Sequence, residues 1–215
     1  MPRLREIPKS EVNDEFVLRM YDMLFEDRDP VTRPDTATGT PGNWWTVFAQ
    51  VPDAFKHATE GFGFYRSPNR ELDEQLRELA QTRVGYAVGS QFVYSQHMKA
   101  ARFSGLSEEQ VQAISSWNTA DCFDEKERAV LAYTDALALE HGRVPDALFA
   151  TLKKHLSEVE IIELTYITCT YVMHGVMSRA LKLEFDDVDE RVTEVPAPDG
   201  ATAETMGMVD KRKKS

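Results

Sequence analysis

Polar side chains suited to acid–base chemistry are concentrated in one stretch of this 215-residue chain. Ser90, Tyr94 and His97 are spaced so that a helix would carry a hydroxyl, a phenol and an imidazole on one face. Glu78 lies in the C-terminal half of the preceding helical pattern. If the two helices pack as a hairpin, its carboxylate reaches the imidazole of His97. Such a pair suits general acid–base catalysis, because burial raises the pKa of the acid and the carboxylate orients the ring.

The start of the second helix is also suited to binding an anion. Ser90 follows Gly89 in the first turn, where free backbone N–H groups and the positive end of the helix dipole favour negative charge. A substrate carboxylate or an enolate oxygen could bind there.

Spacing alone leaves a structural alternative open. In that interpretation Glu78 forms a surface ion pair with a nearby cation, and His97 is a hydrogen-bonded core histidine. The candidate cations are Arg77, Arg83 and Lys99.

The segment from residue 44 to residue 65 is the most aromatic part of the chain. Its rings are Trp44, Trp45, Phe48, Phe55, Phe62, Phe64 and Tyr65. Such a density is typical of a core or a subunit interface, and the functional alternative is a pocket wall in which Trp45 contacts the substrate. We expect His57, in the same segment, to be structural or at the surface. His174 is expected to pack in the core, with entry into the pocket as its alternative.

The remaining histidines and cysteines give no sign of a metal site or a disulfide. The five histidines form no short ligand motif, which predicts that no metal is bound. Cys122 and Cys169 are far apart and belong to no motif, so a disulfide framework is not expected and a catalytic thiol is disfavoured.

Composition restricts the possible partners. The formal net charge is -11, which argues against nucleic acid and against anionic membrane surfaces as partners. No apolar run is long enough for a spanning helix, and the first residues lack the apolar segment of a signal peptide. These observations predict a cytoplasmic protein.

The periodicity of apolar residues predicts an all-α protein, because no segment combines strand alternation with turn chemistry. We expect one domain over residues 1–185, with a motif core at 68–181, an N-terminal helical extension at 10–65 and an irregular or flexible tail at 186–215. The segment 27–42 is rich in proline and threonine and is expected to be an irregular lid or oligomer contact. The expected helices are 10–26, 52–60, 68–86, 89–103, 124–140, 145–154 and 158–181.

Several helix boundaries have explicit signals. Ser67 with Pro68 predicts an N-cap followed by a first-position proline. Capping boxes are expected to begin at Ser107, Asp124 and Ser157, each followed three positions later by Gln or Glu. In the first helix, the expected apolar stripe is Val12, Phe16, Met20, Met23 and Leu24.

The segment from Arg77 to Phe123 resembles the carboxymuconolactone decarboxylase family, which also contains the AhpD-like alkylhydroperoxidases. The motifs that carry the resemblance are RELAQTRV, GSQFVYSQH, ARFSGLSEEQV and FDEKERAVLAY. The resemblance implies an AhpD-like helical bundle in which Glu78 and His97 are the acid–base pair. It also implies a homo-oligomer (a trimer, a hexamer or a dimer) and no metal or organic cofactor.

One departure from the family pattern bears on the chemistry. Peroxidase members carry Cys-X-X-Cys followed by His four residues later, whereas Ser90 and Val93 occupy the two cysteine positions here. Without thiols, peroxide cannot be reduced through a sulfenate and a disulfide. The sequence is therefore similar to the decarboxylase side of the family rather than to the thiol peroxidases.

The expected function is that of a cofactor-free carbon–carbon lyase acting on a small carboxylate, such as a lactone from the breakdown of aromatic compounds. His97 would donate or relay a proton, and Glu78 would set the charge and tautomer of the His97 imidazole. The substrate would contact Ser90, Val93, Tyr94 and Trp45. The same groups could catalyse an isomerisation or a lactone hydrolysis. The alternative is a non-catalytic oligomer that binds a small molecule or a partner protein.

Overall fold

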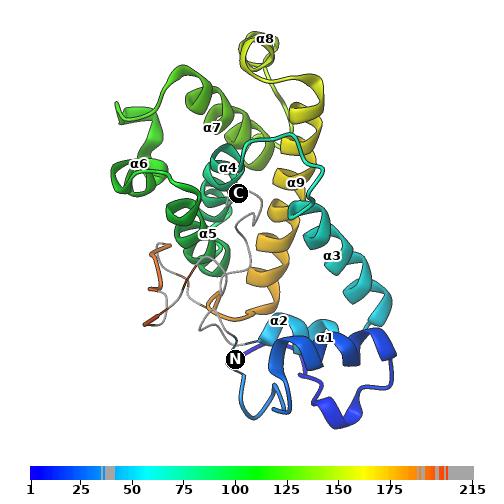
Figure 1. Ribbon diagram of the computed structural model, residues 1–215. Coiled ribbons are helices and arrows are strands. Elements are labelled where there is room, and N and C mark those ends of the chain that lie inside the picture. The colour runs from blue at the N-terminus through cyan, green and yellow to red at the C-terminus, as the bar shows by residue number, and fades with distance from the viewer. Residues whose placement is uncertain are drawn as a thin grey trace.

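Helices make up all the regular structure in the described part of the chain, which comprises residues 1–34, 36, 42–187, 189, 192–196, 199–200 and 202 of the computed structural model. The α-helices are α1 (Glu15–Phe25), α2 (Asn43–Phe48), α3 (Pro52–Tyr65), α4 (Glu74–Ala87), α5 (Gln91–Ser104), α6 (Glu108–Ala113), α7 (Glu125–Ala138), α8 (Asp146–His155) and α9 (Glu158–Leu181). Two short 3-10 helices span Lys9–Glu11 and Ile114–Thr119. The predicted all-α class is confirmed (Figure 1). None of the helices in these ranges combines the length and apolar character of a membrane span.

A hairpin of α4 and α5 forms the centre of the fold, and α7 and α9 pack against α4 (Figure 1). Gly85 allows the two helices to approach closely, because a Cβ there would lie 2.4 Å from the backbone nitrogen of Tyr94. Gly89 turns the chain between them with a φ of 69°, a conformation that strains other residues. The hairpin on which the predicted Glu78–His97 contact depends is therefore present.

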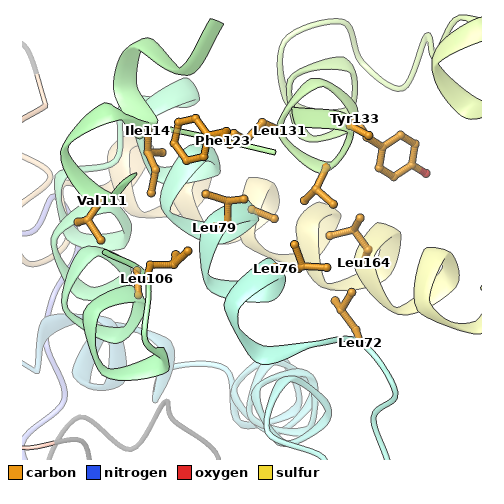
Figure 2. Packing of buried hydrophobic residues seen from close by; sticks show 14 of the residues in the cluster. Leu72, Leu76, Leu79, Leu106, Val111, Ile114, Phe123, Leu131, Tyr133 and Leu164 are labelled. Carbon is orange, nitrogen blue, oxygen red and sulfur yellow. The ribbon is translucent and has the colours of Figure 1, made fainter. Parts of the chain in front are cut away.

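The largest hydrophobic cluster joins α4, α5, α6, α7 and α9. Figure 2 shows Leu76 and Leu79 of α4 among residues contributed by these neighbours, including Val111, Leu131 and Leu164. A second cluster belongs to the N-terminal helices α1, α2 and α3, where Trp44 and Phe55 are almost fully buried. A smaller third cluster lies between these two and surrounds the candidate site; its buried members are Tyr65, Val84, Val93, Ile167 and Tyr171.

Two predicted helix starts are wrong because aspartates further along the chain cap the helices. Asp14, rather than a residue near position 10, accepts the first backbone N–H groups of α1. Asp73, rather than Ser67, accepts hydrogen bonds from the backbone of the first turn of α4. The Ser67 hydroxyl instead accepts the backbone N–H of Asn69 in a local turn.

Two further expectations for the N-terminal helices are corrected. The helix beginning at Pro52 continues to Tyr65, five residues beyond the predicted end. Met23, predicted on the apolar stripe of α1, is 65% exposed, whereas the other predicted residues of the stripe pack against the N-terminal cluster. The fully buried residues of α1 are Val17, Tyr21 and Phe25. Only part of the predicted irregular segment 27–42 is described, and residues 27–34 there form turns.

The second half of the chain follows its sequence signals closely. Ser107, Asp124 and Ser157 each form the predicted reciprocal capping box. After α9, the described residues of the tail have no regular structure and lie against α5. Thr193 and Val195 donate their backbone N–H groups to the side chains of Gln91 and Ser95, each at 2.8 Å.

Candidate active site

Glu78 of α4 and His97 of α5 meet in the interior of the helical hairpin. Nδ1 of His97 lies 2.8 Å from Oε2 of Glu78. The two residues are 0% and 1% exposed. The contact predicted from the hairpin is present, and the alternative of a surface ion pair for Glu78 is wrong.

Arg77 and Tyr65 complete the surroundings of the Glu78 carboxylate. The Arg77 guanidinium donates from Nη2 and Nε to Oε1 of Glu78, at 2.7 and 3.1 Å. The Tyr65 hydroxyl donates to the same oxygen. Arg77 also lies over the Tyr65 ring, with Cζ 4.1 Å from the ring centroid, and is itself 0% exposed. One carboxylate oxygen is thus occupied by Arg77 and Tyr65, and the other faces His97.

These contacts reverse the pKa shift expected for Glu78. Burial acts most strongly and raises the pKa, but the charge of Arg77 and the hydrogen bonds from His97 and Tyr65 together outweigh it, so the pKa of Glu78 is lowered. The expected raised pKa is therefore wrong. Glu78 is a carboxylate, and Tyr65 stays a neutral phenol because burial and the neighbouring carboxylate raise the pKa of its hydroxyl.

The second ring nitrogen of His97 is buried and has no hydrogen-bond partner. The carboxylate accepts the proton of Nδ1, so Nε2 is the atom left to exchange a proton. The His97 ring lies edge-on to Tyr171, with centroids 4.6 Å apart, and to Tyr65 at 5.7 Å. Buried polar atoms usually have partners, so an orphaned imidazole nitrogen within aromatic walls is a candidate for contact with a ligand.

Ser90 occupies the predicted anion site, but a carboxylate of the same chain fills it. Ser90 is the N-cap of α5, and its hydroxyl donates to both oxygens of Asp186, at 3.1 and 3.3 Å. The backbone N–H of Phe92 donates to Asp186 at 3.1 Å. Burial raises the pKa of Asp186 to about 6, although these hydrogen bonds act in the opposite direction. In this arrangement the start of α5 binds an anion, and the anion is Asp186.

Of the other predicted substrate contacts, only Val93 lies in the cluster around His97. Tyr94 points toward Tyr86 and belongs to the large hydrophobic cluster. Trp45 packs on Phe55 and Phe62 in the N-terminal cluster. Neither Tyr94 nor Trp45 therefore contacts His97. Val93 and Tyr94, predicted on one face of α5, pack into different clusters on two sides of the helix.

His174 extends the aromatic surroundings of the site toward the surface. Its ring is buried among aromatic rings, which are Trp44, Phe62, Phe92 and Tyr171. Burial, followed by the proximity of His97, lowers the pKa of His174 to about 4, so this imidazole is neutral near pH 7. It also lines a surface groove between α3 and α9 with an empty volume of about 340 Å³, solvent-open space included, together with His57, Phe62, Tyr166 and Met173.

Neither cysteine takes part in the site. Cys169 is exposed on α9, and Cys122 is half-buried beside the large hydrophobic cluster. Burial raises the pKa of both thiols, which disfavours the reactive thiolate. Among the described residues, no group of three or more His, Cys, Asp or Glu side chains is placed to hold a metal ion.

Sequence reasoning considered Arg77 only for a surface ion pair with Glu78, and it missed Tyr65 and Asp186 at the site. Arg77 was available as the first residue of the RELAQTRV motif, because a charge adjacent to a buried carboxylate is its natural partner. Nothing in the sequence connects Tyr65 with His97, 32 positions later, or Ser90 with Asp186, 96 positions later.

The helical bundle built on this hairpin has an AhpD-like fold. The solved structures agree with this class. A protein of unknown function from Agrobacterium tumefaciens, described as a candidate antioxidant defence protein AhpD, superposes with a TM-score of 0.58 and 25% identity, covering 68% of this chain and 96% of the other. A debrominase, Bmp8, determined in complex with 2,3,4-tribromopyrrole, has a TM-score of 0.65 and 16% identity over 87% of this chain and 95% of the other, which shows the fold alone.

A family model matches the central part of the chain. Residues 53–136, which contain α4, α5 and the Glu78–His97 pair, match the model of the carboxymuconolactone decarboxylase family, so the resemblance predicted from the motifs is confirmed. The uncharacterized protein YdfG of Bacillus subtilis (strain 168) is 29% identical over 97 residues. That match covers 45% of this chain and 66% of the relative, just under two thirds of its length.

Proposed function

We propose that this protein is a cofactor-free acid–base enzyme of the carboxymuconolactone decarboxylase type. Its reaction would remove CO₂ from, or shift a proton on, a small carboxylate such as a lactone from the breakdown of aromatic compounds. The observation that carries the proposal is the state of His97: Nδ1 is held by the Glu78 carboxylate, and Nε2 is buried without a partner.

The chemistry follows from the two nitrogens of His97. When a substrate carboxylate leaves as CO₂, the electron pair of the broken carbon–carbon bond remains on the substrate as an enolate. Protonated His97 then gives its Nε2 proton to the carbon, while Glu78 stabilises the imidazolium through Nδ1. In the neutral state, Nε2 has the lone pair needed to take a proton for the next turnover or for an isomerisation.

Arg77 has a supporting role in this scheme. Its charge is directed at Glu78 and lowers the pKa of that carboxyl, so Glu78 cannot act as the proton donor at neutral pH. The proton must therefore come from His97. Tyr65 fixes the same carboxylate from the other side and restricts the orientation of the pair.

Apolar walls around Nε2 support decarboxylation in particular. Val93, Ile167 and the rings of Tyr65 and Tyr171 form the third hydrophobic cluster. A localised carboxylate loses more solvation in such surroundings than a delocalised enolate does, so desolvation favours loss of CO₂. The groove between α3 and α9 would be the entrance, because His174 lines it and contacts Tyr171 behind it.

Matched histidine variants test the proposal. His97→Asn keeps a donor near the position of Nδ1 but removes Nε2. His141→Asn makes the same change at an exposed residue of the loop before α8. Each purified variant would be checked by circular dichroism and assayed on a panel of carboxylated lactones for CO₂ release and for deuterium uptake into product from D₂O.

We expect kcat of His97→Asn to fall by about 10² to 10⁴-fold, with KM changed far less, and His141→Asn to match the wild type. A folded His97→Asn protein with unchanged turnover would refute the acid–base role. If the wild type binds compounds of the panel but turns none over, the non-catalytic binding protein becomes the better description.

A further inference from the structure

Gln81 of α4 has a buried side-chain amide without a hydrogen-bond partner. The residue is 0% exposed. Neither Nε2 nor Oε1 of this amide is paired, and among the described residues Gln81 alone has two such buried side-chain atoms. Burying a polar group without a partner destabilises the folded protein, so native interiors rarely keep one. An amide with both its donor and its acceptor unpaired is suited to a ligand that supplies the complementary pair.

Helix geometry places Gln81 beside the Glu78–His97 pair. Residues three apart on a helix share a face, so Gln81 lies one turn after Glu78 and one turn before Val84. Glu78 holds Nδ1 of His97, and Val84 belongs to the third hydrophobic cluster, which surrounds the site. The other side of α4 carries Leu79, which packs in the large hydrophobic cluster. Gln81 therefore faces the site, on the same side as the imidazole whose Nε2 is buried and unpaired.

The charged groups of the site are already engaged with one another. Arg77, the cation in contact with Glu78, donates from Nε and Nη2 to that carboxylate and from Nη1 to the carbonyl oxygen of Tyr65. The proposed loss of CO₂ leaves an enolate, whose oxygen needs hydrogen-bond donors in a water-excluded site. The NH₂ group of Gln81 is a buried donor that the fold leaves unpaired.

The acceptor atom of Gln81 restricts the ligand further. Oε1 only accepts hydrogen bonds, and an ionised carboxylate also only accepts, so the two atoms would repel each other in a buried site. A hydroxyl beside a carbonyl is complementary to the amide, because the carbonyl oxygen accepts from Nε2 while the hydroxyl donates to Oε1. Asn and Gln recognise the adjacent donor and acceptor of adenine in this bidentate way.

We propose that Gln81 is a substrate-binding residue that recognises a hydroxyl beside a carbonyl of the substrate. The role rests on the proposed function and narrows its substrate class to small carboxylates with this pair, such as a carboxylated α-hydroxylactone. When the bond to the leaving carboxylate breaks, its electron pair passes to the carbonyl oxygen. The hydrogen bond from Gln81 strengthens as that oxygen becomes an enolate, and the Nε2 proton of His97 then goes to the carbon.

A stability comparison tests the unpaired amide without any substrate. Gln81→Met keeps the length of the side chain and removes both polar atoms. Gln75→Met is the matched control on the same helix, because Nε2 of Gln75 donates to the carbonyl oxygen of Ser104 at 3.0 Å. We expect the melting temperature to rise by about 2 to 4 °C in Gln81→Met and to fall in Gln75→Met. A fall in both variants overturns the proposal, because the amide of Gln81 would then be hydrogen-bonded in the folded protein.

Paired substrates test the recognition itself. Carboxylated lactones that carry or lack a hydroxyl beside the ring carbonyl would be assayed for CO₂ release and for binding by isothermal titration calorimetry. We expect the wild type to prefer the hydroxylated lactones by about 10²-fold or more in kcat/KM. Gln81→Met should lose about 10²-fold on the hydroxylated lactones and most of this preference, and Gln75→Met should match the wild type.

The same assays separate a failure of the Gln81 role from a failure of the proposed function. A folded Gln81→Met protein with unchanged preference, beside an inactive His97→Asn, overturns the role of Gln81 and leaves the acid–base function intact. If the wild type binds hydroxylated lactones without turnover, the proposed function fails; weaker binding by Gln81→Met then supports the recognition, and equal binding overturns it. A wild type that prefers lactones without the hydroxyl, or that binds none of the panel, overturns the proposal.

Discussion

The buried ion pair between Arg77 and Glu78 gives the most quantitative prediction. Both side chains are 0% exposed, and two guanidinium N–H groups donate to one carboxylate oxygen. Glu78→Gln removes the negative charge and keeps the volume. The nearest remaining carboxylate of the site is Glu74, whose Oε1 lies 3.5 Å from Nη2 of Arg77.

The expected cost follows from the burial of the charge that remains. Breaking a buried pair by removing one partner costs about 3 to 5 kcal/mol, because the other charge is left undercompensated. We expect a loss of this size for Glu78→Gln and for Arg77→Met. The double variant leaves neither charge alone, so its loss should be smaller than the sum by about 2 to 3 kcal/mol.

Urea unfolding followed by circular dichroism measures these free energies. The exposed pair of Lys153 and Glu158, whose side chains are 49% and 80% exposed, is the control. Lys153→Met and Glu158→Gln should each cost about 1 kcal/mol or less and be nearly additive. Additive losses at Arg77 and Glu78, or losses as small as those of the control, would refute the assignment of a coupled buried pair.

Four further variants test other parts of the structure. Asp186→Asn removes a carboxyl whose pKa is raised to about 6. Because ionisation of this carboxyl is unfavourable in the folded state, the stability of the wild type should fall relative to Asp186→Asn as the pH rises from about 4 to 6. His174→Phe tests the opposite dependence on pH. Because the pKa of His174 is lowered to about 4, the wild type should lose up to about 3 kcal/mol of unfolding free energy as the pH falls from about 6.5 to 4, and His174→Phe should not. Gly85→Ala should lower the melting temperature sharply, since its Cβ would lie 2.4 Å from the Tyr94 nitrogen. Gly63 on α3 has open space where a Cβ would lie, so Gly63→Ala should instead stabilise the protein by about 0.5 to 1 kcal/mol. Equal effects of Gly85→Ala and Gly63→Ala on the melting temperature would contradict the close packing of α4 on α5.

Local signals in the sequence predicted the helices and one central contact. The capping boxes at Ser107, Asp124 and Ser157 are visible because both halves of each motif lie within one turn. The Glu78–His97 contact was predictable for a related reason. One tight turn joins the two antiparallel helices, so facing residues at similar distances from the turn lie side by side.

Contacts between distant segments could not be predicted. The start of α5 was predicted to bind a substrate anion, but the carboxylate that lies there is Asp186, which arrives through the fold of α9 and the chain after it. The pKa of Glu78 had the wrong predicted sign because burial is opposed by Arg77 together with the hydrogen bonds from His97 and Tyr65, and only the geometry shows that these contacts jointly outweigh burial. Spacing likewise could not show which side of α5 Tyr94 faces.

The protonation of His97 is the most direct test of the acid–base account. Nitrogen-15 NMR of the imidazole, with His97 assigned by comparison with His97→Asn, reports which ring nitrogen carries the proton in the neutral state. The account predicts a proton on Nδ1, held by the Glu78 carboxylate, and an unprotonated Nε2; in Glu78→Gln this tautomer preference should weaken. A neutral His97 with its proton on Nε2 in the wild type would contradict the account, because that nitrogen could not then accept a proton from a substrate.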